Sequence, residues 1–147
     1  MKGEKVIKEI EKNSEKYTKK YTDSKFLSKL SFLARRSGLK TVIYAEVLYY
    51  LMKAPTTPKM AKLKILAVLG YVVAPIDLLP DMFLGVGFLD DIAALGITIE
   101  MVRKTMRDYV TPNILKQAAA STKALFKNVS EEEIITLINK LNLYEQI

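Results

Sequence analysis

Four aspartates stand in the most apolar part of this 147-residue chain, and they are the residues best suited to do chemistry. Asp77 and Asp81 belong to a turn that reads APIDLLPD from residue 74, and Asp90 and Asp91 follow shortly after. No lysine or arginine occurs from residue 65 to residue 102. Because Mg²⁺ and Ca²⁺ take oxygen ligands from clustered carboxylates, one hypothesis is a divalent-cation site at these four residues. A metal-dependent enzyme would have to use this cluster.

The favoured interpretation of the aspartates is structural. Aspartate is a preferred N-cap and its charge suits the positive end of a helix. Asp77 would cap the turn that holds Pro80, and Asp90 or Asp91 would cap the next helix. The remaining carboxylates would pair with basic residues elsewhere, namely Arg35, Arg36 or Lys59. A site for binding a partner or handling protons is a further alternative. If the aspartates serve as caps and ion-pair partners, the protein needs no cofactor.

Other catalytic chemistry has little support in the sequence. The chain has no histidine and no cysteine, so the usual general base and the commonest soft nucleophile are both missing. Gly85 and Gly87 begin a partial dinucleotide-binding pattern, but Asp90 occupies the third glycine position, where a carboxylate repels phosphate. We therefore expect a non-enzymatic protein. The absence of cysteine also fits a reducing compartment, and we expect a cytoplasmic location with attachment to the membrane periphery.

Charge is unevenly distributed along the chain. Residues 1–64 hold 16 Lys and Arg against 6 Asp and Glu, a net charge of +10, whereas residues 65–102 carry −5. A basic amino-terminal half suits an anionic partner, either a membrane surface or a nucleic acid; a solvated helix face is the alternative. Nucleic acid is disfavoured because no recognition motif accompanies the charge. The candidate contacts with an anionic surface are basic residues of one helical stretch: Lys29, Arg35, Arg36 and Lys40.

Apolar residues recur at helical spacing throughout the chain, which predicts an all-α protein. Thr57 is placed to N-cap a helix with Pro58 at its first position, and residues 130–133 form a capping box. The expected fold is a small helical bundle built on a helical hairpin with an Asp/Pro-rich turn. Its parts are a charged amphipathic helix (1–24), a helical core (25–110) and carboxyl-terminal helices of the same domain (111–147). The expected helices are 4–22, 24–37, 39–53, 58–73, 90–109, 112–127 and 131–141.

No segment is well suited to cross a membrane. A spanning helix needs roughly 20 mostly apolar residues, but the uncharged run over 65–76 has 12. Two helices entering lipid on either side of the turn would also bring four carboxylates to membrane depth, at a few kcal/mol each. A buried hairpin in a soluble or peripheral protein is therefore the better interpretation.

The spacing of the turn residues resembles the YkvA-like family, a domain of unknown function. The resemblance covers about residues 38–107, and this chain departs from it at Leu84, where members carry proline. It implies a compact helical hairpin and a frequent membrane-protein label, with no established reaction. We therefore expect a helical interaction or structural module with an unidentified protein partner. The motif residues that carry the resemblance include Pro75, Asp77, Pro80, Asp81, Gly87, Asp90 and Asp91.

Overall fold

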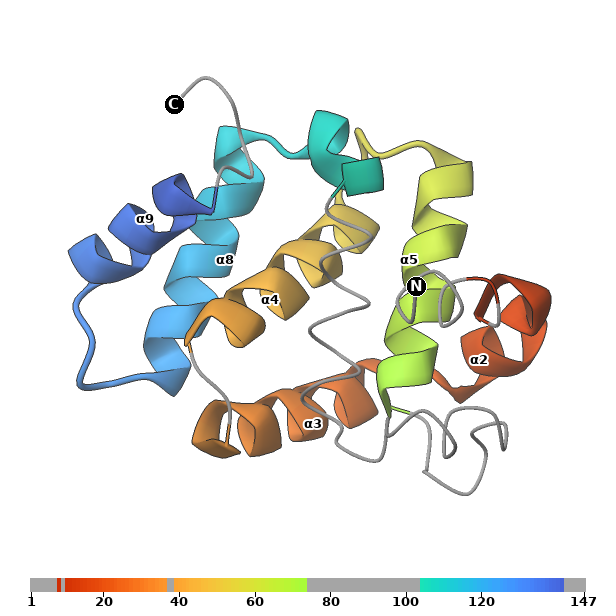
Figure 1. Cartoon of the computed structure of the whole chain (residues 1–147), viewed down its shortest axis with the longest axis horizontal. Coiled ribbons are helices and arrows are strands. Elements are labelled where there is room, and N and C mark those ends of the chain that lie inside the picture. The colour runs from red at the N-terminus through yellow and green to blue at the C-terminus, as the bar shows by residue number, and fades with distance from the viewer. Residues whose placement is uncertain (1–7, 9, 37–38, 74–103, 142–147) are drawn as a thin grey trace.

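The computed structural model of this protein describes residues 8, 10–36, 39–73 and 104–141 (Figure 1). This part of the chain is helical and contains no strand, which confirms the all-α prediction. The predicted hairpin turn lies in residues 74–103, outside the described residues, as do the motif residues within it. The elements are α2 (Ser14–Lys20), α3 (Asp23–Arg36), α4 (Leu39–Lys53), α5 (Lys59–Val73), the 3₁₀ turn η2 (Arg107–Tyr109), α8 (Pro112–Leu125) and α9 (Glu131–Lys140).

Helix α4 forms the centre of the bundle. Figure 1 shows it between α8 and α9 on one side and α5 and α2 on the other, with α3 below. Every residue from 42 to 48 is buried. A helix that is apolar on all faces has to be enclosed by its neighbours, which explains why α4 contacts α3, α5, α8 and α9.

Helix α2 packs closely on α5 through one glycine. A Cβ atom added to Gly70 would overlap the backbone carbonyl of Tyr17, so no larger residue fits without moving α2. Tyr17 is fully buried, and its ring meets that of Tyr71 edge to face, with centroids 5.6 Å apart. The contact fixes the position of α2. Residues 8 and 10–12 are also helical, so the helix predicted over 4–22 is interrupted by a turn at Asn13.

The helix caps confirm one expectation and correct another. Ser130 Oγ accepts from the Glu133 backbone N–H (3.1 Å) and opens α9 as predicted. Thr111 caps α8, accepting from the Ile114 N–H (3.3 Å) with Pro112 at the first position. The predicted Thr57 cap is wrong: the Pro58 carbonyl accepts the first α5 bond, from the Lys62 N–H (3.0 Å). The buried Thr57 hydroxyl has no hydrogen-bond partner in the described structure.

Candidate functional site

The aspartate cluster predicted from the sequence is not among the described residues. Neither the capping role nor the cation site of Asp77, Asp81, Asp90 and Asp91 is tested, and both stay predictions. Within residues 8, 10–36, 39–73 and 104–141, no group of three or more carboxylates could hold a metal ion. The site that the structure does describe is therefore built from other residues.

The predicted basic contacts lie at the junction of α3 and α4. Arg35 and Lys40 are exposed, and the Lys40 ammonium stands 5.9 Å from the centre of the Tyr44 ring. Lys29 is half-buried, with its ammonium 5.7 Å from the Phe32 ring centre. The side chain of Arg36 falls outside the described part. Of the four predicted residues, Arg35 and Lys40 are thus the two whose exposure would allow contact with an anionic surface.

A second cationic surface, at the start of α5, was missed by the sequence reasoning. Met60 and Leu63 are 68% and 47% exposed, and they lie three residues apart on the same helix. Lys59 and Lys64 are exposed beside them, Lys62 is half-buried, and α5 contains no acid. We call residues 59–64 the α5 patch. Lysines that alternate with apolar residues over 59–64 were the sequence signal that could have identified it.

The α5 patch and the predicted basic residues lie near opposite ends of the central helix. Lys40 is in the first turn of α4, whereas α5 begins six residues after the α4 end. A helix of 15 residues is about 22 Å long. The two cationic surfaces can therefore be tested separately.

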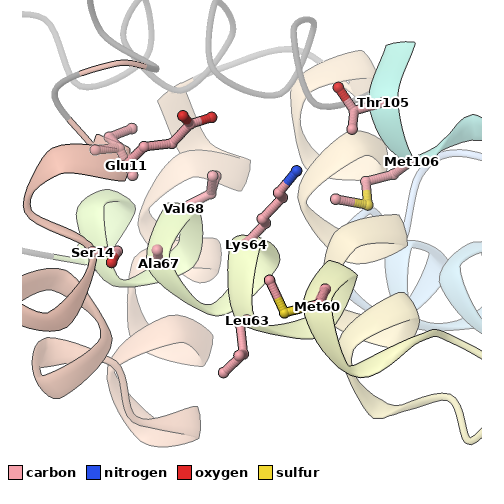
Figure 2. Close-up of a pocket in the computed structure, with 10 residues that line it drawn as sticks. Glu11, Ser14, Met60, Leu63, Lys64, Ala67, Val68, Thr105 and Met106 are labelled. Atoms are coloured by element: carbon pink, nitrogen blue, oxygen red, sulfur yellow. The ribbon is translucent and has the colours of Figure 1, made fainter.

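A pocket of about 410 Å³ opens beside the α5 patch, between α2, α5 and the residues just before η2. Figure 2 shows Lys64 rising from α5, with Glu11 on one side and Thr105 and Met106 on the other. Its size falls within the ~300–1,000 Å³ typical of small-molecule sites. The apolar lining consists of Ile10, Met60, Leu63, Ala67, Val68 and Met106. The polar lining consists of Glu11, Ser14, Lys64 and Thr105.

One carboxyl group is buried inside the bundle. Glu46, the only acid of α4, is 1% exposed. Burial raises its pKa to about 7, against a smaller opposing effect of a hydrogen bond with the Ser121 side chain. Its Oε2 atom has no hydrogen-bond partner in the described structure. The group is therefore poised to change protonation near neutral pH inside the contact between α4 and α8.

A surface network ties the start of α3 to the end of α4. The Lys53 ammonium donates to Asp23 Oδ2 (2.8 Å), and the Tyr21 hydroxyl donates to Asp23 Oδ1 (2.7 Å). These hydrogen bonds, that from Lys53 foremost, lower the Asp23 pKa, while burial chiefly raises the Tyr21 pKa. Phe26 and Tyr49 stack beside them with ring centres 5.1 Å apart. The network holds two helices together, and its charges already have partners.

The described helices form a small all-α bundle. Helix α4 is enclosed by its neighbours, whereas the first half of α5 presents an exposed cationic surface. The chain matches a family model described as "Protein of unknown function (DUF1232)" over residues 61–97. It is also 27% identical over 85 residues to the "Uncharacterized membrane protein YkvA" of Bacillus subtilis (strain 168), covering 54% of this chain and 80% of that protein. The two matches confirm the resemblance to the YkvA-like family that the motif residues indicated.

No solved structure matches the chain. Within the described ranges, every helix is too short or too polar to traverse a bilayer. The matched family model begins at Ala61, inside the α5 patch, so this surface belongs in part to the region that carries the family resemblance.

Proposed function

We propose that this protein is a non-enzymatic helical module that attaches to the surface of anionic membranes through the α5 patch. The observation that carries the proposal is the exposure of Met60 and Leu63 among three lysines, on a helix without acids. Helices that lie in a membrane interface combine apolar side chains that enter the acyl boundary with lysines that face anionic head groups. The name of the Bacillus subtilis relative, a membrane protein, supports this direction.

Two contributions to the free energy of membrane binding are expected, and both are modest. Each lysine near an anionic surface contributes about 1 kcal/mol, so Lys59, Lys62 and Lys64 together supply roughly 3 kcal/mol. Insertion of Met60 and Leu63 adds about 0.8 kcal/mol for each methylene removed from water. Neither source alone gives stable attachment. The proposed mode is therefore reversible binding that weakens with salt.

Flotation of the full chain with lipid vesicles tests the proposal. We expect binding to vesicles that contain about one-third phosphatidylglycerol, weak binding to pure phosphatidylcholine, and a marked loss of binding as salt rises from 50 to 500 mM, because ions screen the lysines (Debye length roughly 14 to 4 Å). Equal binding to both vesicle types, or no binding to either, would contradict the proposal. Salt-sensitive binding to duplex DNA with none to vesicles would instead favour the nucleic-acid alternative.

A further inference from the structure

The pocket beside the α5 patch is continuous with the proposed membrane contact. Met60, Leu63 and Lys64 belong to both, so a lipid beneath the patch would lie at the pocket opening. The walls are mostly apolar, and a methionine stands on each side, Met60 from α5 and Met106 from the segment before η2. Methionine is flexible and adapts to irregular apolar ligands. The pocket is thus suited to a flexible hydrocarbon chain.

Two opposite charges line the pocket. Figure 2 shows the Glu11 carboxylate, from the residues before α2, on one side and the Lys64 ammonium, from α5, leaning toward Thr105 on the other. Both side chains are exposed, and neither belongs to an ion pair among the described residues. Thr105, with its hydroxyl, lies beyond Lys64 on the far side. A ligand with one negative and one positive group would satisfy both charges, whereas a purely anionic head group would meet the carboxylate as well as the ammonium.

We infer that this pocket takes up one acyl chain of a zwitterionic phospholipid from the membrane to which the protein attaches, an inference that rests on the proposed function. The head-group phosphate would lie against the Lys64 ammonium and the head-group amine against the Glu11 carboxylate. The chain would lie along Met60, Ala67 and Val68. The lysines of the α5 patch provide general attraction to the surface, and the pocket selects one lipid class.

The test uses a water-soluble probe, so that pocket binding is separated from surface attachment. Isothermal titration of the full chain with twelve-carbon lysophosphatidylethanolamine, below its micelle concentration, should show saturable one-to-one binding. Thr105→Trp fills the opening from an exposed position and should weaken binding at least tenfold. Lys64→Gln should weaken it about two- to fivefold, the range of an exposed ion pair. Lys116→Gln, at an exposed lysine of α8 outside both the α5 patch and the pocket lining, is the matched control and should leave binding unchanged.

Head-group selection is tested by Glu11→Gln. This change should weaken binding of lysophosphatidylethanolamine about two- to fivefold, while binding of the chain-matched lysophosphatidylglycerol stays the same or improves. Equal effects on both probes would overturn the assignment of the head group. Absence of binding, or equal binding by Thr105→Trp, would overturn the inference and leave the pocket to be occupied by another part of the chain or by nothing. Vesicle flotation of the same samples keeps the outcomes distinct, because attachment without probe binding refutes only the pocket.

Discussion

Helices α4 and α5 are both 15 residues long and strongly apolar, yet they differ in how much of their surface is buried. Helix α4 is enclosed by four other helices, and even its one acid is buried. Helix α5 buries its second half against α2 but exposes Met60 and Leu63 in its first half. The comparison teaches that apolar content alone does not separate core from contact surface. The lysines interspersed at 59, 62 and 64 mark the half of α5 that faces outward.

The largest expected effect on stability comes from Glu46, the buried acid of α4, and it tests how completely α4 is enclosed. The folded state raises the Glu46 pKa from 4.5 to about 7, so the folded protein retains a proton that the unfolded chain releases. Stability from this group is therefore present below pH 4.5 and is lost as pH rises toward 7. The loss amounts to roughly 3 kcal/mol. Urea unfolding as a function of pH measures it.

Glu46→Gln removes the titration and keeps the shape of the side chain. This variant should exceed the parent in stability by up to about 3 kcal/mol at pH 8 and by little at pH 5. Ser121→Ala should act in the opposite direction at pH 8, because it removes a hydrogen bond that favours the charged form. A parent whose stability is flat between pH 5 and pH 8 would show that the group is not enclosed as described.

The next largest effect concerns the close contact between Gly70 of α5 and the Tyr17 backbone of α2. Gly70→Ala places a methyl group against the Tyr17 carbonyl, and overpacking of this kind costs about 1–3 kcal/mol. A backbone atom cannot rotate away, so the cost should fall near ~3 kcal/mol. Better helix propensity offsets about 1 kcal/mol of it, which leaves an expected net loss of about 2 kcal/mol. Hydrogen exchange should show loss of protection in α2 while α4 and α8 keep theirs. Unchanged stability and α2 protection would contradict the packing.

The smallest effect comes from two Thr-Pro pairs that look alike in the sequence. Thr111 caps α8, so Thr111→Val should cost about 1 kcal/mol. Thr57 is buried with a hydroxyl that has no partner in the described structure, so Thr57→Val should be neutral or stabilising. Thermal unfolding of the two variants side by side measures the difference. Equal losses would mean that both threonines serve as caps.

These pairs also show how far the sequence predicts this fold. Helical class, the bounds of α4 and the cap at Ser130 followed from periodicity and capping rules, which are local properties of the chain. The failure at Thr57 is tertiary, since burial decides whether a hydroxyl reaches the helix end. The pocket could not be predicted from the sequence either, because its walls come from segments about forty to fifty positions apart that only the packing brings together. The aspartate motif was the strongest sequence signal, and its role stays a prediction.

Vesicle binding by two sets of charge-neutralising variants, one of three residues and one of two, tests the central claim most directly. Replacement of Lys59, Lys62 and Lys64 by glutamine should lower the affinity for phosphatidylglycerol-containing vesicles by roughly a hundredfold, at about 1 kcal/mol for each lysine. Replacement of Arg35 and Lys40, exposed at the other end of α4, should lower it by less than about fivefold, because a surface in contact with the α5 patch lies beyond a Debye length from them. A larger loss from the Arg35 and Lys40 pair than from the three α5 lysines would contradict the account and move the contact to the junction of α3 and α4.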